Sequence, residues 1–445
     1  MTNPPTQKVA ICGAGIAGLT LACILSTHAP HINIDIYESK PEVSAIGEGV
    51  AIWKRSWQII QDLGLEDEMR RRGVPFPLDG ERQGPIFRKS DQKEGVAFHN
   101  HVMPYGPTAI QRPTLLDILQ MHLSPNCQIH TSKRLVNFIE SSSPYPKINL
   151  KFSDGTESNA DVFVGADGVH SIVRSVMYAK LSEAGDTEEE RLKLDGLREP
   201  IWTGTFAYRC TVPFGMFKEK YPDHPVFLTP KIWCGKNQHV VTQPWPETGI
   251  IGVSGFVTLD SGEGTLYEGP WVTDVKKEEV IKKFESWEDD LVVLMNNITK
   301  ASRWAIHVVK PLPNCVSGRI ALMGDAAHAM TPHQGVGGGQ AIEDAHILGQ
   351  LLSHVRTTNT TLPEILKIYE KIRLPQAQIA WQKSRTNGLI YEFMHPDFQH
   401  IQPGAQEEEL KELGEAINES FGWLAEGGCY EDWSRAEELV LTLKD

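Results

Sequence analysis

The chain has 445 residues, of which 40% are hydrophobic and 22% charged, so it can build a sizeable core and is neither a peptide scaffold nor a mainly disordered chain. Forty-three Lys and Arg residues against 57 Asp and Glu residues leave a net charge of -14, which disfavours nucleic acid and anionic lipid as partners. The seven cysteines form no C-x-x-C pair, and no apolar run reaches the roughly 20 residues of a membrane span. We therefore expect a cytoplasmic protein with reduced thiols, no metal site and no transmembrane segment.

A βαβ unit of about thirty residues is predicted at the N-terminus. Residues 8–12 and 32–37 have the β-branched composition of strands, and the apolar positions between them recur at helical spacing. The turn that joins the first strand to the helix reads Gly13-Ala-Gly15-Ile-Ala-Gly18. In such a turn the first glycine permits the tight bend, the second lets backbone amides approach a pyrophosphate, and the third lets the helix pack close to its strand.

Glu38 follows the second strand and completes a dinucleotide-binding fingerprint. A carboxylate in this position accepts hydrogen bonds from ribose hydroxyls and repels a 2′-phosphate. The N-terminal unit therefore predicts binding of FAD or NAD rather than NADP.

Further strands and helices alternate along the rest of the chain. In order, we expect a helix over residues 51–65, strand-like pieces over 81–103, a helix that starts at Arg112, paired strands over 126–140 and 147–152, and a buried strand over 162–164. The charged stretch 180–200 is typical of a solvated helix and a linker, and it marks a change of domain. Beyond it we expect antiparallel strands over 202–259, a helix over 276–295, a buried strand over 319–323, a helix over 340–354 and a helical tail from residue 362.

Two more glycine-rich motifs follow predicted buried strands and decide between FAD and NAD. The first is Gly165-Ala-Asp167-Gly168, and the second runs from Gly324-Asp325 to Gly337-Gly338-Gly339. An Asp beside a Gly suits the binding of polyol hydroxyls where a backbone must pass close to the ligand. The second motif also opens a helix, whose N-terminal amides can face an electron-rich carbonyl.

These three motifs, in this order and at about this spacing, resemble those of the single-component FAD aromatic hydroxylases, or class A flavoprotein monooxygenases, over roughly residues 8–355. The run 324–345 and the tripeptide at 207–209 are most similar to the salicylate hydroxylase branch. The resemblance implies an α/β fold: a discontinuous Rossmann-like FAD-binding domain, an inserted β-sheet substrate domain and a helical C-terminal region. The expected divisions are 1–78, 105–180 and 300–355 for the FAD-binding domain, 79–104 and 200–299 for the substrate domain, and 356–445 for the helical region.

The resemblance also implies a role for each residue that matches a family motif. Besides Gly13, Gly15 and Gly18 at the pyrophosphate, the FAD-binding residues would be Glu38 at the adenosine ribose, Ala51 through its backbone, Arg112 along the pyrophosphate and ribityl chain, Asp325 at a ribityl hydroxyl, and the amides of Gly337 and Gly338 at flavin N1 and O2. Asp167 would support both the FAD site and the approach of the nicotinamide, and Pro332 would line the oxygen-transfer face of the flavin. Two positions depart from the family: Gly339 stands where many relatives have Asn, and Glu48 stands where Ala is common.

The implied reaction uses NAD(P)H as a transient co-substrate, because the chain carries no second dinucleotide fingerprint. NAD(P)H reduces FAD, dioxygen forms a flavin C4a-hydroperoxide, and this species hydroxylates an aromatic ring. We expect a small hydroxy- or aminobenzoate such as salicylate or 4-hydroxybenzoate as substrate, with loss of CO2 if the attacked carbon bears a carboxylate. The protein is expected to be a monomer or a homodimer.

Two residues of the strand-rich segment are the candidates for handling the substrate. Arg209 could face a carboxylate or phenolate, although a surface ion pair is the plainer interpretation. Tyr208 should point to the opposite face of the strand. His239 could accept a proton near neutral pH, although a buried structural histidine is the commoner case. His333, beside Pro332, is a weaker candidate for substrate contact.

Three alternatives remain open from the sequence. The same motifs could serve an FAD monooxygenase of a bulkier phenolic or polyketide in secondary metabolism. A non-catalytic flavin-binding protein would bind flavin without being reduced by NADH. A plain NAD dehydrogenase would be purified as a colourless protein.

Overall fold

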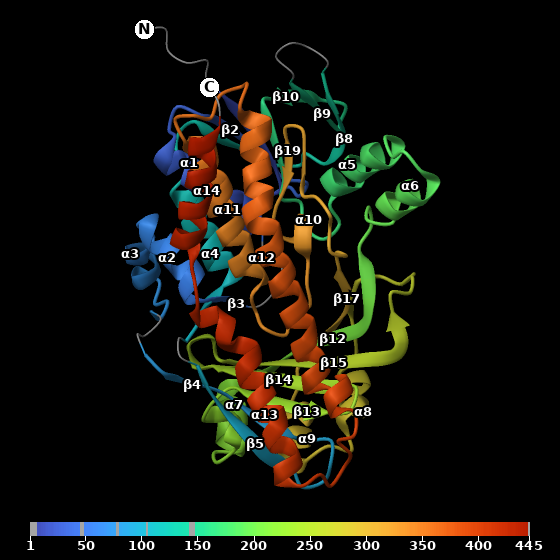
Figure 1. Cartoon of the computed structure of the whole chain (residues 1–445). Coiled ribbons are helices and arrows are strands. Elements are labelled where there is room, and N and C mark those ends of the chain that lie inside the picture. Colours follow the sequence, from blue (N-terminus) through green and yellow to red (C-terminus); the bar gives the residue numbers. More distant parts are fainter. Residues whose placement is uncertain (1–6, 45–48, 77–79, 104–105, 142–146, 444–445) are drawn as a thin grey trace.

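The computed structural model describes residues 7–44, 49–76, 80–103, 106–141 and 147–443. Two large sheets dominate it, one of six strands and one of eight, and they lie toward opposite ends of the molecule (Figure 1). The mixed α/β fold agrees with the fold class that the sequence predicts.

The six-stranded sheet has the order β18-β19-β11-β1-β2-β7. In the same order its strands are Val316–Ser317, Ile320–Leu322, Val162–Gly165, Lys8–Cys12, Asn33–Tyr37 and Cys127–His130. All neighbours are parallel except β18, which pairs with β19 in the antiparallel direction. Parallel strands end at one edge of a sheet, so the segments that follow β1, β2, β11 and β19 meet there, where α/β folds bind their ligands.

Apolar helices cover this sheet because its strands are buried on both faces. α1 (Ile16–His28) packs against α4 (Arg112–Met121) and α11 (Gly337–Ser353), and α11 in turn contacts α2 (Lys54–Asp62) and α14 (Cys429–Thr442). The same part of the molecule also contains the helices α3 (Glu66–Arg71), α5 (Ile172–Glu183), α6 (Glu188–Asp195) and α10 (Asp325–His328). It further contains a three-stranded sheet of β8 (Leu135–Glu140), β9 (Ile148–Phe152) and β10 (Glu157–Ala160). No residue of α6 is buried, as the charge of this stretch predicts.

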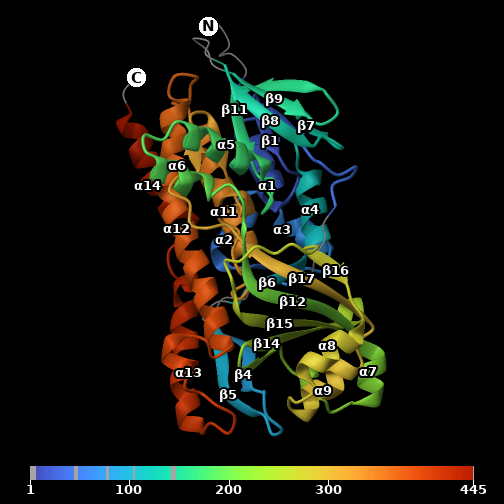
Figure 2. The ribbon, with the colours of Figure 1, turned by 90° about the vertical axis from the view of Figure 1, so that its right-hand side faces the viewer.

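The eight-stranded sheet has the order β16-β17-β12-β15-β14-β13-β4-β5. In the same order its strands are Val272–Asp274, Lys300–Val308, Ile201–Pro213, Ile250–Glu263, Gln238–Trp245, Lys231–Gly235, Arg82–Lys89 and Val96–Met103. One face packs against α7 (Phe214–Lys220), α8 (Lys277–Phe284) and α9 (Asp289–Asn296), and these helices lie on one side of the sheet in Figure 2. We call the opposite face, which carries Arg209, Phe256 and His239 and packs against α12 (Leu362–Tyr391) and α13 (Glu407–Gly422), the inner face.

Helix α12 is 30 residues long and runs past both sheets (Figures 1 and 2). Its first half packs in the core of the six-stranded sheet, and its last turns pack against the inner face of the eight-stranded sheet. Together with α13 and α14 it confirms the helical tail that the sequence predicts.

Several expectations differ from the structure, and the helix expected over 276–295 is in fact the two helices α8 and α9. Residues 49–52 form strand β3 (Gly49–Ile52), which pairs with β6 (Thr108–Gln111), so the predicted helix from residue 51 is wrong over its first residues and starts at Lys54. β8 pairs with β9 as expected, but β7 joins β2 in the six-stranded sheet instead. β17 belongs to the eight-stranded sheet, so a domain boundary at residue 300 cuts into that sheet; the remaining domain division stays a prediction.

Within the part of the chain that the structure describes, no helix is both long enough and apolar enough to cross a membrane.

Candidate functional site

The turn between β1 and α1 is shaped to receive an anion. Gly13 has a φ of 106°, and a Cβ there would collide with the Ala166 carbonyl. A Cβ at Gly18 would collide with the Gly13 carbonyl, whereas a Cβ at Gly15 would meet no atom within 4 Å. The first amides of α1 therefore border open space at Gly15, and their dipoles favour a phosphate group there.

Glu38 stands at the end of β2, beside this turn. Its carboxylate accepts hydrogen bonds from the backbone amides of Ala14, at 3.0 Å, and Lys40, at 2.9 Å. These bonds fix the carboxylate next to the glycine turn, and the oxygens keep further lone pairs for ribose hydroxyls.

The side chain of Asp167 forms hydrogen bonds within the loop that follows β11. Its carboxylate accepts from the Ser171 hydroxyl at 2.5 Å and from the amides of Ile172 at 2.8 Å and Val173 at 3.2 Å, so it holds the first turn of α5. Burial raises the pKa of this carboxyl group. Asp167 thus shapes the loop after β11.

A buried arginine in the first turn of α5 ties this loop to the next motif. Arg174 donates to the carbonyl of Val169 at 2.8 Å and to that of Ala326 at 2.9 Å. Ala326 follows Asp325, so one side chain links the loops that follow β11 and β19.

Asp325 begins α10 and has an exposed side chain. The preceding Gly324 has a φ of 58°, and its amide donates to a carboxylate oxygen of Asp344 at 3.0 Å. The same oxygen of Asp344 lies 2.6 Å from Nε2 of His328. Asp344 therefore holds the turn from the buried side, and the Asp325 carboxylate remains exposed.

Asp344 belongs to a buried ionic cluster that joins four helices. Nε of Arg373, on α12, lies 2.9 Å from Asp344, and Nη1 of Arg373 lies 3.1 Å from Glu343 and 3.3 Å from Asp432. Arg55, on α2, lies 3.1 Å from Glu343. Although burial raises it, the charges of His328 and Arg373 bring the pKa of Asp344 down to about 2.

The glycines at the start of α11 are packed against β3. A Cβ at Gly338 would lie 2.6 Å from Cγ1 of Val50, and one at Gly339 would lie 2.8 Å from Oγ of Ser56. A Cβ at Gly335 would lie 3.5 Å from that of Ala51. Ser56 thus occupies the space that a Cβ at position 339 would enter.

The other predicted cofactor residues border the same region. Arg112 is the first residue of α4, directly after β6, and Ala51 lies opposite Ala109 in the β3–β6 ribbon. Pro332 is exposed in the loop between α10 and α11. Glu48 lies outside the described residues.

Arg209 lies on the inner face of the eight-stranded sheet, and its guanidinium stacks over the ring of Trp304 at 5.1 Å. Tyr208 points the other way, into the core beneath α8, and its hydroxyl donates to Glu279 at 3.0 Å. The expected alternation of these two neighbours is confirmed, and only Arg209 can reach a ligand between the sheets.

His239 is fully buried on the same inner face. Its Nδ1 lies 2.8 Å from Oε1 of Glu392, the residue after the last turn of α12. Its ring stacks on Phe256, with 4.4 Å between the centroids, and meets the ring of His333 edge-on at 5.1 Å. No motif in the sequence pointed to Glu392, which lies 153 positions further along the chain.

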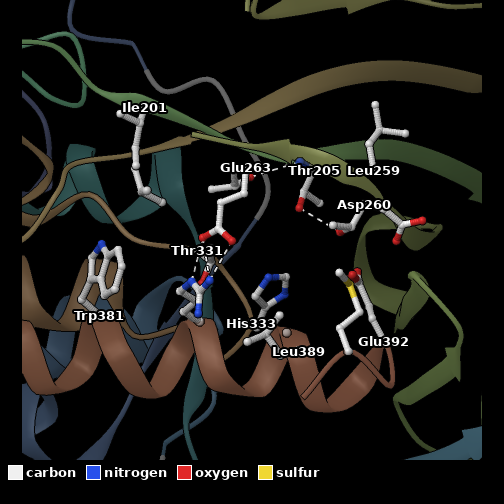
Figure 3. A pocket seen from close by; sticks show the side chains of 16 residues that line it. Ile201, Thr205, Leu259, Asp260, Glu263, Thr331, His333, Trp381, Leu389 and Glu392 are labelled. Atoms are coloured by element: carbon white, nitrogen blue, oxygen red, sulfur yellow. Dashed lines mark hydrogen bonds and ion pairs between the residues drawn. The ribbon is translucent and has the colours of Figure 1, made fainter. Parts of the chain in front are cut away.

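A pocket opens between the inner face and α12, beside His333 (Figure 3). Its polar lining includes Thr205, Thr258, Asp260, Thr331 and Glu392, and the ion pair of Arg385 with Glu263, at 2.7 Å, lies in the same wall. Burial and the neighbouring His239 lower the pKa of His333 well below its usual value, so this imidazole is neutral at neutral pH.

The structure thus forms two groups of candidate residues. Gly15, Glu38, Asp325 and the start of α11 border the edge of the six-stranded sheet, and Arg209 and His239 lie on the inner face of the eight-stranded sheet. The open side of Gly15 and the exposed Asp325 carboxylate fit a bound FAD, because diphosphate and ribityl groups need such surfaces.

Comparison with known proteins agrees with this geometry. A family model described as an FAD binding domain matches residues 6–195 and 261–384. The salicylate hydroxylase of Pseudomonas putida is 31% identical over 98% of this chain and 98% of its own length, and 6-methylsalicylate 1-monooxygenase of Aspergillus terreus is 30% identical over 86% and 83%. A solved structure of a salicylate hydroxylase substrate complex superimposes with a TM-score of 0.80, at 26% identity, over 97% of this chain and 98% of that one.

Proposed function

This chain belongs to the family that carries this FAD-binding domain and is a flavoprotein aromatic monooxygenase of the salicylate hydroxylase type, and we propose that its substrate is a small hydroxy- or aminobenzoate such as salicylate or 4-hydroxybenzoate. Oxidation of NAD(P)H, bound transiently, supplies the electrons, and O2 supplies the oxygen atom. When the attacked carbon carries the carboxylate, CO2 is lost.

The placement of Arg209 and His239 on one face carries this proposal. Arg209 pairs with Ser254 on β15, and His239 pairs with Phe256 on the same strand. Arg209 and His239 are thus two strands apart across the sheet and offset by two residues along it, which places their Cα atoms about 12 Å apart. A span of this size suits one aromatic ring bound between the two side chains, with its carboxylate at Arg209 and its hydroxyl at His239.

Each of these side chains has a defined task. Arg209, oriented by its stacking on Trp304, binds the carboxylate. His239 accepts the proton of the ring hydroxyl, which makes the ring more electron-rich. Pro332, exposed in the loop after α10, would line the oxygen-transfer face of the flavin. The bound FAD supplies the activation of dioxygen.

The cofactor is held by the edge of the six-stranded sheet. The amides at Gly13, Gly15 and Gly18 would bind the diphosphate, and Glu38 would bind the ribose. Arg112 would lie along the pyrophosphate and ribityl chain, and Asp325 would bind a ribityl hydroxyl. The flavin itself would be bound by the backbone of Ala51, and its carbonyl edge by the amides of Gly337 and Gly338. The loop that Asp167 organises receives the nicotinamide.

The test is consumption of NADH or NADPH in the presence of a panel of benzoates, with the products identified by mass. We expect at least one hydroxybenzoate to accelerate the oxidation about tenfold or more and to gain one oxygen atom. Oxidation that no member of the panel accelerates, with no hydroxylated product, would contradict the proposal.

A bulkier phenolic or polyketide is the second candidate. The pocket beside His333 favours it, because a longer molecule could extend into that space. Titration of the flavin fluorescence with simple benzoates and with extended phenolics separates the two, since the preferred class binds at lower concentration.

A further inference from the structure

The imidazole of His239 is held as a base with one open nitrogen. A carboxylate only accepts hydrogen bonds, so the 2.8 Å contact with the Glu392 carboxylate places the ring hydrogen on Nδ1. Nε2, at the opposite edge of the ring, then carries an unshared electron pair. Nε2 is buried and has no hydrogen-bond partner, an arrangement that a ligand hydroxyl would complete.

The surroundings prevent the ring of His239 from turning away. Phe256 stacks on it with an interplanar angle of 6°, and Tyr391 contacts it edge-on at 5.5 Å. The amide of Asn237 donates to the backbone carbonyl of Glu392 at 3.0 Å, so the start of β14 is tied to the end of α12. The imidazole and the carboxylate therefore stay in register with each other.

Glu392 has a second neighbour besides His239. Its side chain is only 4% exposed, yet it lines the pocket between the inner face and α12. In Figure 3 Glu392 lies at the edge of that pocket, near the labelled His333 and Asp260. The carboxylate thus stands between a fully buried imidazole and a space that solvent can enter.

We propose that Glu392 is the positioning residue that makes His239 a base, and that the pocket beyond Glu392 is the outlet for the proton. The proposal rests on the proposed function and names a further residue of its site. The O–H bond of the substrate breaks and its proton joins Nε2 of His239. The proton on Nδ1 passes to Glu392, and the resulting carboxylic acid releases it to water in the pocket.

Three ionisable groups packed around the pair stay neutral near neutral pH. Burial lowers the pKa of His333, on the loop after α10, and raises those of Tyr391, on α12, and Cys234, on β13. Asp260, on β15, accepts from Asn237 at 2.7 Å, and Glu263 is paired with Arg385 at the pocket wall. His333, Tyr391 and Cys234 therefore do not take up a proton that leaves the substrate near neutral pH.

The test is Glu392→Gln, which keeps the shape and the bond to Nδ1 but removes the charge and the proton acceptor. The probe is 4-hydroxy-3-nitrobenzoate, whose phenolate absorbs visible light, bound to the FAD-loaded protein and titrated with pH. In the wild type we expect the pKa of the bound phenol to lie below that of the free compound. In E392Q it should rise by about one unit, a tenfold loss of preference for the phenolate. Glu392→Asp, which retains the charge, should recover part of the shift.

The matched control is Glu279→Gln, because Glu279 also accepts from a ring side chain, Tyr208, but on the opposite face of the sheet. E279Q should leave the titration unchanged. If E392Q titrates like the wild type, the proposal is overturned. If E392Q loses its FAD, His239→Gln is titrated instead, and an unchanged phenol pKa there overturns it equally. Absence of benzoate-stimulated turnover in the wild type contradicts the proposed function alone, since the titration needs no turnover.

Discussion

The guanidinium of Arg174 donates to the carbonyl of Ala326 across 2.9 Å and thereby joins the loop that Asp167 organises to the turn that presents Asp325. Arg174 and Ala326, which belong to the two motifs, are 152 positions apart in the sequence. One buried cation thus keeps the loops after β11 and β19 at a fixed separation.

Replacing Arg174 by Met should weaken FAD binding about tenfold. The change leaves the carbonyls of Val169 and Ala326 without their charged donor, at a cost of about 1–3 kcal/mol. The dissociation constant, from flavin fluorescence, checks this. Arg198→Met is the control, because Arg198 pairs with Asp195 near the surface and should leave FAD affinity unchanged. Equal affinity in R174M and the wild type would contradict the link.

Asp325→Ala should yield largely FAD-free protein with an intact fold. The exposed carboxylate at the start of α10 is the group assigned to a ribityl hydroxyl, and alanine offers no acceptor there. Flavin content per chain after purification, with circular dichroism as the test of folding, measures the effect. Normal flavin content would refute the ribityl role.

Arg209→Ala should raise KM for an acidic aromatic about tenfold or more, while the flavin spectrum stays that of the wild type. The loss removes the charged partner of the substrate carboxylate and leaves the FAD site untouched. Arg303→Ala is the matched control, because Arg303 lies on the neighbouring strand with its charge directed to Glu279 on the other face. An unchanged KM in R209A removes Arg209 from the pocket.

The cluster around Asp344 predicts a loss of stability in acid. The pKa of Asp344 is about 2 in the folded protein against 3.8 as the ordinary value. A depressed folded pKa contributes stability that is present above pH 4 and is lost as the pH falls toward 2, amounting to about 2 kcal/mol. The free energy of unfolding by urea, measured at pH 6 and at pH 3, should show this decline.

Asp344→Asn should be less stable than the wild type at pH 6 and should lose less stability on acidification. The substitution removes the titrating carboxyl group and leaves Arg373 with two of its three acidic partners. A decline as steep as that of the wild type would assign the acid sensitivity to other carboxyl groups.

The sequence predicted features that depend on neighbours in the chain. Gly13, Gly15 and Gly18 with Glu38 form one local unit of strand, turn and helix, and the opposite directions of Tyr208 and Arg209 follow from the two-residue period of a strand. The pairing of strands that are distant in the sequence could not be predicted in this way. Strand β3 is only four residues long and exists because β6 pairs with it, so its sequence suggests the start of a helix.

Side-chain partnerships between distant segments were equally hidden. Glu392 and Asp432 stand in a tail that the sequence predicts only as helical, and their partners His239 and Arg55 lie in other parts of the fold. Charged residues on a helix ordinarily face solvent, so nothing in the pattern of the tail marks either residue as buried. Only the packing of α12 and α14 against the two sheets brings them inside.

Helix α12 sets a fixed length within the molecule. Arg373, in the ionic cluster behind the FAD site, and Glu392, behind His239, are separated by 19 positions, which corresponds to about 28 Å of helix. One inserted residue between them would advance the far end by about 1.5 Å and rotate it by about 100°. Such an insertion cannot leave both contacts intact, so this span should tolerate substitutions on its outer surface far better than any change in its number of residues.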